Sequence, residues 1–123
     1  MTNKMHGGCL CGDVRYEATG DAVFLRNGYC RDCQRTSGGA FTPAIFMPDG
    51  SVKTYGEAKC YESIADSGKK ASRGFCPKCG SQLFAKLERY LGLLGLRAGT
   101  LDDPSLLSQT LIYSHLVRRI GIL

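Results

Sequence analysis

Tryptophan is absent from this chain of 123 residues, and no apolar run approaches the roughly 18 residues that a membrane-spanning helix needs. Residues 1–8 carry no apolar segment of the kind found in secretory signal peptides. Internal repeats, linkers and low-complexity segments are absent as well. The sequence therefore predicts a soluble, cytoplasmic protein with no membrane partner, folded as a single domain over residues 1–123.

The chain also lacks a strong excess of positive or negative charge. The 16 lysines and arginines exceed the 11 aspartates and glutamates by only 5, and acidic residues separate the basic clusters. A nucleic-acid partner usually requires a basic face or a recognition motif, and no such motif is evident here. The modest basic excess suits an anionic small molecule instead.

Glycine is abundant, with 16 residues, and this composition favours short strands and tight turns over long helices. Val14, Tyr16 and Ala18 alternate with polar residues, which is the pattern of a half-buried strand. The sequence therefore predicts a mainly antiparallel β domain with little helix. Further strands are expected at 23–27, 41–47, 52–55, 60–64, 70–75, 82–87 and 90–96, about one helical turn at 31–35, and a last strand or helix at 110–117.

Two local signals refine this scheme. Pro43 cannot donate a backbone hydrogen bond, so it predicts an edge strand or a bulge at 41–47. Asp49-Gly50 is a hairpin signal, and it predicts that the same strand turns back into 52–55.

Seven cysteines dominate the chemistry that the sequence allows. Around the last two, Pro77 and Gly80 favour the tight turn of a zinc knuckle. Closely spaced cysteines in a reducing compartment are more typical of metal ligands than of disulfides, and the odd total agrees with this. Six of the seven form three pairs: the first pair, Cys9 and Cys11; the second pair, Cys30 and Cys33; and the third pair, Cys76 and Cys79.

A structural zinc takes four protein ligands, so another pair must join the third. The spacing of the cysteines alone leaves two groupings of the pairs possible. If the first pair joins the third around the structural zinc, the second pair is left as an incomplete metal site with positions open to a substrate. If the second pair joins, the result is a closed zinc ribbon and the first pair is spare.

Three ordered motifs surround the cysteine pairs, at 7–16 (GGCLCGDVRY), 30–38 (CRDCQRTSG) and 73–81 (RGFCPKCGS), and a fourth motif without cysteine follows at 97–105 (RAGTLDDPS). In these motifs the chain resembles the glutathione-dependent formaldehyde-activating enzyme family, which also includes centromere protein V. The resemblance implies a mainly β fold of small twisted antiparallel sheets, similar to the Mss4-like or β-tent fold and stabilised by zinc. It also favours the first grouping, with the structural zinc bound by Cys9, Cys11, Cys76 and Cys79.

The family's second zinc is bound by a Cys-x-Cys-x-x-Cys pattern, from which this sequence departs. Cys30 and Cys33 match its last two cysteines, but Gly28 stands where the first is expected. A second, catalytic zinc would therefore lack one ligand here.

The activity implied by the resemblance is that of a carbon–sulfur lyase or synthase. Glutathione or a related thiol would add to formaldehyde or a small aldehyde, with Cys30 and Cys33 as the catalytic residues. A thiol that coordinates zinc loses its proton near neutral pH and becomes the nucleophile. Two alternatives remain: a non-catalytic binding module with one structural zinc, which Gly28 favours, and a nucleic-acid zinc ribbon.

The other candidate residues carry weaker signals. We expect Cys60 to be a buried or half-buried thiol rather than a substitute ligand, because free cysteines are commonly buried. His6 is expected to be a mobile N-terminal residue rather than a ligand. The remaining expectations are His115 in a structural role, Asp32 solvated beside the open site, Arg31, Arg35 and Lys78 as surface charge, and Arg97 and Asp102 fixing the late turn.

Overall fold

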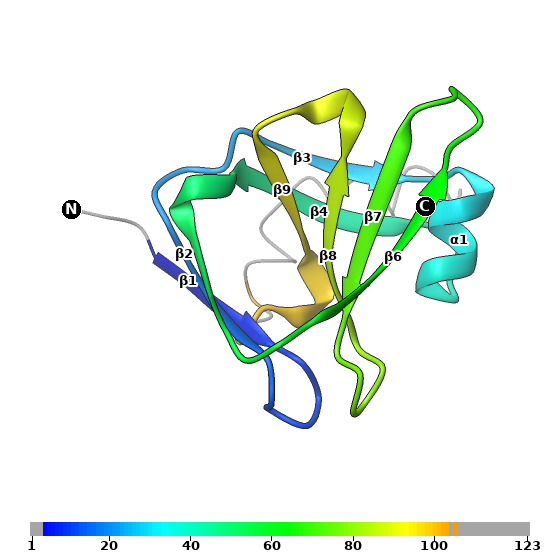
Figure 1. Ribbon diagram of the computed structural model, residues 1–123. Coiled ribbons are helices and arrows are strands. Elements are labelled where there is room, and N and C mark those ends of the chain that lie inside the picture. Colours follow the sequence, from blue (N-terminus) through cyan, green and yellow to red (C-terminus); the bar gives the residue numbers. More distant parts are fainter. Residues whose placement is uncertain (1–3, 104, 106–123) are drawn as a thin grey trace, which may run out of the picture.

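The computed structural model describes residues 4–103 and 105, and in them it forms two antiparallel sheets (Figure 1). The smaller sheet has the strand order β1-β2-β5, with bounds Lys4–Gly8, Arg15–Thr19 and Val52–Tyr55. The larger sheet has the order β3-β4-β9-β8-β7-β6, with bounds Phe24–Gly28, Thr42–Pro48, Leu93–Arg97, Gln82–Leu87, Lys70–Phe75 and Lys59–Ile64. The predicted fold class, mainly β with small antiparallel sheets, is confirmed.

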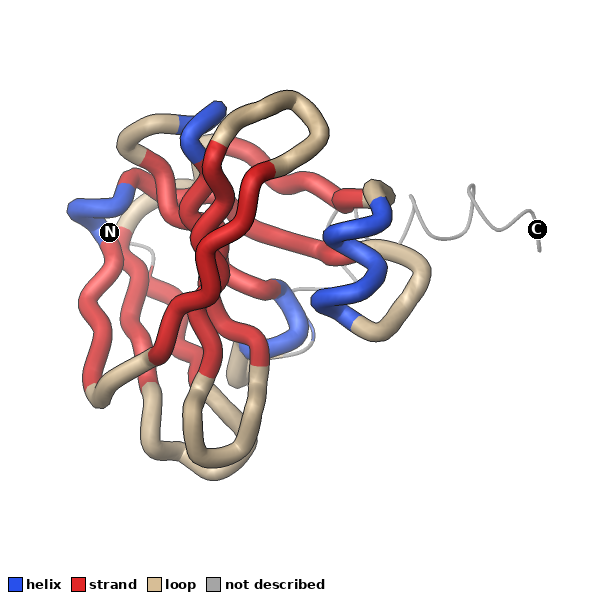
Figure 2. Tube along the Cα trace, turned by 45° about the vertical axis from the view of Figure 1, so that its right-hand side comes forward, coloured by secondary structure: helices blue, strands red, loops and turns tan. Residues whose placement is uncertain are grey.

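Helical structure in the described residues is limited to short segments. Helix α1, Arg31–Ser37, follows β3 and packs against β4 at one end of the larger sheet (Figure 2). Three 3₁₀ turns occupy Asp49–Ser51, Glu88–Tyr90 and Ala98–Thr100. No helix in residues 4–103 and 105 is long and apolar enough to cross a membrane.

The hydrophobic core joins the two sheets. In β2, Tyr16 and Ala18 are buried while their neighbours are partly exposed, as the period-two pattern predicts. The ring of Tyr16 contacts Phe84 of the larger sheet edge-on, at a centroid distance of 5.7 Å. Burying each large apolar side chain contributes about 1.5–3 kcal/mol. The other core members include Val14, Ile45, Met47, Leu83, Leu96 and Leu101.

The prediction for Pro43 was wrong, because β4 is an interior strand that pairs with both β3 and β9. Its pairing with β9 begins only at Ala44, so Pro43 has no β9 residue opposite it. The missing backbone N–H is therefore tolerated at the end of an interior strand.

The hairpin predicted at Asp49-Gly50 was also wrong. A 3₁₀ turn at Asp49–Ser51 carries the chain from β4 in the larger sheet to β5 in the smaller one, where β5 pairs with β2. The segment is a crossover between sheets.

The strands predicted at 60–64, 70–75 and 82–87 are present, and β9 occupies the later part of 90–96. The sequence analysis did not foresee β1, which pairs with β2 along its full length. The segment predicted at 110–117, and with it His115, lies outside the described residues.

Candidate functional site

Four cysteines from two loops meet at one end of the molecule. The loops join β1 to β2 and β7 to β8, and they project side by side at the bottom of Figure 1. All four sulfur atoms lie within 4.8 Å of one another. The Sγ atom of Cys11 lies 3.6 Å from that of Cys9 and 3.7 Å from that of Cys76. A tetrahedral zinc with Zn–S bonds of about 2.3 Å holds its sulfurs about 3.8 Å apart, so this spacing suits a four-thiolate metal site.

The backbone of both loops directs the sulfurs inward. Gly80 has φ of +80°, a conformation that residues with a side chain rarely adopt, and its N–H donates to the carbonyl of Cys76. The backbone N–H groups of Val14 and Lys78 donate to the sulfurs of Cys9 and Cys76, at 3.3 and 3.4 Å. These bonds hold both sulfurs in place.

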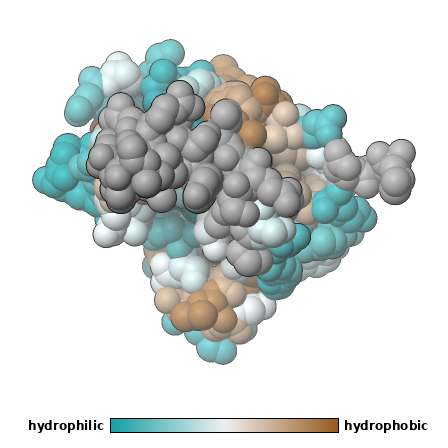
Figure 3. Space-filling model, turned by 180° about the vertical axis from the view of Figure 1, so that it is seen from behind, coloured by the Kyte–Doolittle hydropathy of each residue, from teal (hydrophilic) through white to brown (hydrophobic). Residues whose placement is uncertain are grey.

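Contacts between the two loops add to this arrangement. The N–H of Leu10 donates to the Ser81 hydroxyl at 3.0 Å, and Lys78 forms a salt bridge with Asp13 at 3.6 Å. Seen from behind, the described surface is mixed, with hydrophobic areas at the top and at the lower end where the two loops lie (Figure 3).

The clustered sulfurs change one another's protonation. The Ser81 hydroxyl, the Ser81 N–H and the Cys11 N–H lower the pKa of Cys79 to about 5. For Cys11, the Asp13 N–H lowers the pKa, but desolvation and the neighbouring sulfurs outweigh it and raise the pKa to about 12. Four thiolates this close repel one another, and a bound divalent cation removes that conflict. The donor set therefore fits a metal ion such as zinc.

The second pair lies away from this cluster, at the start of α1. The Sγ atom of Cys30 accepts a hydrogen bond from the N–H of Cys33 at 3.3 Å, and the two sulfurs lie 3.1 Å apart. Cys30 is exposed and Cys33 is half-buried. Desolvation raises the pKa of Cys30, but the hydrogen bonds from Cys33 outweigh it and lower the pKa; burial and the adjacent Cys30 raise the pKa of Cys33.

Gly28 lies directly against the sulfur of Cys33. A Cβ atom placed at Gly28 would lie only 2.5 Å from that sulfur, so the Cys33 side chain occupies the space that a side chain at 28 needs. Within the described residues, no third Cys, His, Asp or Glu groups with this pair. Catalytic zinc sites usually have three protein ligands, so the pair does not fit a second zinc site.

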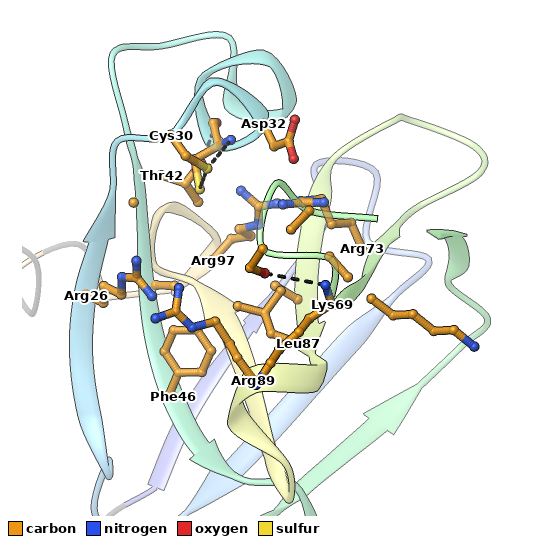
Figure 4. A pocket seen from close by; sticks show the side chains of 18 residues that line it. Arg26, Cys30, Asp32, Thr42, Phe46, Lys69, Arg73, Leu87, Arg89 and Arg97 are labelled. Atoms are coloured by element: carbon orange, nitrogen blue, oxygen red, sulfur yellow. Dashed lines mark hydrogen bonds between the residues drawn. The ribbon is translucent and has the colours of Figure 1, made fainter. Parts of the chain in front are cut away.

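The pair lines one end of a pocket on the larger sheet (Figure 4). Side chains of β4 alternate between this pocket and the core, because Ala44 and Phe46 line the pocket while Ile45 and Met47 belong to the core. The pocket thus occupies the face of the sheet that turns away from the core. Its apolar floor is completed by Ala71, Ala85 and Leu87, and its polar lining includes Arg26, Asp32, Lys69, Lys70, Arg73, Arg89 and Arg97.

Two buried arginines give the pocket its electrostatic character. Arg73 and Arg97 are 7% and 6% exposed, and neither forms a salt bridge within the described part of the chain. The Nε atom of Arg97 has no hydrogen-bond partner there, and burial followed by the charge of Arg73 lowers the pKa of Arg97. Burying unpaired like charges is costly, so these residues would gain from a bound anion.

Figure 4 shows how the charges are spread along the pocket. Arg73 and Arg97 lie near the middle in this view, between Cys30 and Asp32 at one end and Arg26, Arg89 and Phe46 at the other. A ligand in this pocket would meet the cysteine pair at one end and cations along the rest of its length. Such a site suits an elongated molecule with a sulfur atom and more than one negative charge.

The structure decides between the two groupings of cysteine pairs that their spacing in the sequence left open. It brings the first and third pairs together, and the zinc-ribbon grouping of the second and third pairs is not formed in residues 4–103 and 105. Arg31, Arg35 and Lys78, expected to be surface charge, do not line the pocket.

Two expectations about single residues were wrong. Cys60 is exposed, not buried, because β6 is an edge strand whose residues face solvent. His6 belongs to β1, where it pairs with Glu17, rather than to a loose terminus, and it is not part of the cysteine cluster.

Arg97 and Asp102 were both expected to fix the late turn. Asp102 instead accepts bonds from the Arg15 side chain, and its own N–H donates to the carbonyl of His6. Arg97 lines the pocket, although its carbonyl also accepts a bond from the Thr100 hydroxyl.

Sequence analysis missed the cationic pocket. Arg73 and Arg97 looked like members of basic or turn segments, and nothing in their spacing shows that β7 and β9 bring them to the same face. The one usable signal was an arginine at the end of the apolar segment 93–96, where a charged side chain is unexpected on a buried strand.

The two sheets and the cysteine cluster define a β protein with a candidate four-thiolate metal centre. A family model described as glutathione-dependent formaldehyde-activating enzyme matches residues 4–115, and the chain belongs to this family. The resemblance stated from the four motifs is therefore confirmed.

A solved crystal structure of a Rhodobacter sphaeroides protein has a similar fold. The match covers 84% of this chain and 94% of that one, with 20% sequence identity and a TM-score of 0.66. At this identity the likeness shows the fold alone. No curated protein matches the chain.

Proposed function

We propose that this protein is a carbon–sulfur lyase that forms and breaks the bond between glutathione, or a related anionic thiol, and formaldehyde or another small aldehyde. The observation that carries the proposal is one pocket that combines the Cys30–Cys33 pair with the buried arginines Arg73 and Arg97. The family to which the chain belongs supports the same substrate class.

Charge determines which thiol the pocket would select. Glutathione has two carboxylates and one amino group, so its net charge at neutral pH is negative while its thiol is protonated. The arginines would bind the carboxylates, since guanidinium and carboxylate form paired hydrogen bonds. Burial of Arg73 and Arg97 makes this contact stronger than it would be at the surface, because water screens it less.

The cysteine pair would act on the sulfur end of the substrate. Cys30, exposed and hydrogen-bonded by the Cys33 N–H, would accept the proton of the glutathione thiol. The glutathione thiolate then attacks the carbonyl carbon of the aldehyde, and the resulting alkoxide takes the proton back from Cys30. The product is S-hydroxymethylglutathione, and the reverse sequence cleaves the carbon–sulfur bond.

The four-cysteine cluster would have a structural role. Cys9, Cys11, Cys76 and Cys79 would hold a zinc ion, which ties together the two loops and couples metal binding to folding. Because no third ligand accompanies Cys30 and Cys33 in the described residues, no step above requires a second zinc.

Exchange spectroscopy by NMR tests the activity directly, because glutathione and formaldehyde also react without a catalyst. The protein should accelerate the exchange between free glutathione and its hydroxymethyl adduct, and Cys30→Ser should remove most of that acceleration. Cys60→Ser is the matched control, since Cys60 lies on β6 and does not line the pocket. An exchange rate equal to the uncatalysed rate would contradict the proposal.

A non-catalytic binding module is the second candidate, and Gly28 in place of the family's cysteine favours it. In that case the pocket would bind the hydroxymethyl adduct without changing its exchange rate. Isothermal titration with glutathione, run beside the exchange measurement, separates binding from turnover.

A further inference from the structure

We propose that Cys30 and Cys33 form a redox-active dithiol that exchanges with anionic low-molecular-weight disulfides such as glutathione disulfide. This inference does not rest on the lyase activity, because it concerns electron transfer at the pair itself. It starts from the two sulfurs, which lie 3.1 Å apart with no third metal ligand grouped with them in the described residues.

The two cysteines differ in accessibility in the way that thiol–disulfide exchange requires. Cys30 is exposed at the pocket, so its sulfur can reach an incoming disulfide. Cys33 is half-buried behind it, with its sulfur against the backbone of Gly28. The exposed sulfur can therefore attack first, and the recessed sulfur can resolve the intermediate without leaving its place.

The exchange balances in two steps. The Cys30 thiolate attacks one sulfur of the disulfide, the substrate S–S bond breaks, and one thiolate leaves as a mixed disulfide forms on Cys30. The Cys33 thiolate then attacks the Cys30 sulfur and releases the second thiolate. The protein dithiol is oxidised to a disulfide, and the small disulfide is reduced to two thiols that take up the released protons.

The pocket supplies selectivity for anionic disulfides. The Cys33 sulfur lies within the electrostatic influence of Arg73 and Arg97, and Arg26, Lys69 and Arg89 line the same pocket. Glutathione disulfide has four carboxylates and a net negative charge, whereas cystamine carries two positive charges. We expect the pair to react faster with glutathione disulfide than with cystamine, the reverse of the preference of a free thiol in a neutral environment.

Peptide mass spectrometry after acid quenching and alkylation tests the inference on the full, zinc-loaded chain. In mixtures of glutathione and its disulfide, wild-type protein should form the Cys30–Cys33 disulfide and accumulate little mixed disulfide. Cys33→Ser should trap a glutathionyl group on Cys30. Cys30→Ser should react at Cys33 at least about tenfold more slowly, because the remaining thiol is recessed.

Cys60 serves as an internal reference in every sample, because it is exposed on an edge strand outside the pocket. Arg89→Gln should reduce the preference for glutathione disulfide over cystamine. Arg35 is exposed on α1 and lies outside the pocket, so Arg35→Gln should leave this preference unchanged.

The inference is overturned if Cys30 in the Cys33→Ser variant gains a glutathionyl group no faster than Cys60. It is also overturned if wild-type protein keeps both thiols reduced in glutathione disulfide, or if the pair retains a metal ion that blocks alkylation. Trapping without lyase turnover would contradict only the proposed function, and turnover without trapping would contradict only this inference.

Discussion

The two cysteine sites of this protein use the same side chain in opposite settings. In the four-cysteine cluster, two loops bring four sulfurs within 4.8 Å of one another; Cys9 and Cys76 are buried, Cys79 is half-buried and Cys11 is exposed. At the Cys30–Cys33 pair, only two sulfurs meet, and no further donor groups with them within the described residues. Closed coordination suits a structural metal, whereas an open pair beside a cationic pocket suits chemistry on a ligand.

Spacing alone does not separate these roles, because the second and third pairs have the same Cys-x-x-Cys form. The third pair lies in a loop between paired strands, facing a second loop that carries another pair. The second pair lies at the start of a helix, and the residue against the Cys33 sulfur is Gly28, at the end of the preceding strand. The surrounding backbone, rather than the motif, determines how many donors meet.

The largest effect is expected from breaking the closed site. Cys76→Ser removes one of four candidate ligands, and the apparent binding free energy of a structural zinc is about 10–16 kcal/mol in small zinc domains. We expect this variant to lose its zinc and to be unfolded at room temperature by circular dichroism. Cys60→Ser should melt like the wild type. A Cys76→Ser protein with full zinc content and an unchanged melting temperature would refute the structural role of the cluster.

The next largest effect is expected in the cationic pocket, where one substitution should raise the stability of the protein and lower its affinity for glutathione. Arg97→Met keeps the volume of a buried side chain and removes an unpaired charge, so we expect stability to rise by about 1–2 kcal/mol. Glutathione affinity should fall about tenfold or more, because a charge-assisted hydrogen bond is lost.

Urea denaturation and isothermal titration measure the two effects of Arg97→Met. Arg35→Met, on the exposed side of α1, should change neither quantity by a comparable amount. Loss of stability together with unchanged affinity would assign Arg97 a structural role instead.

The third prediction concerns a variant that adds a third candidate metal ligand to the Cys30–Cys33 pair. Gly28→Cys adds a third thiol beside the pair, and Cys33 must rotate because a Cβ at position 28 lies 2.5 Å from its sulfur. We expect this variant to bind one zinc more than the wild type, at a cost of about 1–3 kcal/mol from overpacking. Gly28→Ser has a side chain of similar size and should show the cost without the extra zinc. Equal zinc content in both variants would disprove this account of Gly28.

The smallest effect is expected at the late turn, where Asp102 forms a salt bridge with Arg15. Arg15 lowers the pKa of Asp102 through hydrogen bonds and charge, and both side chains are about half exposed. The stabilisation is present above the unfolded-state pKa of Asp102 and is lost as the pH falls through its lowered folded-state pKa. Asp102→Asn should therefore lower the melting temperature slightly at neutral pH and not at all in strong acid. A difference that grows in acid would contradict this assignment.

Much of the fold follows from local pattern. The alternation at Val14, Tyr16 and Ala18 identifies β2, and the knuckle between β7 and β8 follows from Cys-x-x-Cys with its Pro77 and Gly80. These features depend on neighbouring residues, which is why the sequence could predict them.

Features that depend on sheet assignment could not be predicted in the same way. Asp49-Gly50 correctly marks a turn, but a turn signal does not show that β5 joins the other sheet. Cys60 is exposed only because β6 is the last strand of its sheet. The cationic pocket needs the order of β7, β8, β9 and β4, which brings together Arg73 and Arg97 from distant parts of the chain.

Counting zinc ions per chain by native mass spectrometry, with Cys30→Ser beside the wild type, tests the contrast between the two sites most directly. This account predicts one zinc in the wild type, one zinc in Cys30→Ser, and none in Cys76→Ser. Two zincs in the wild type that fall to one in Cys30→Ser would contradict it, because the open pair would then be a metal site.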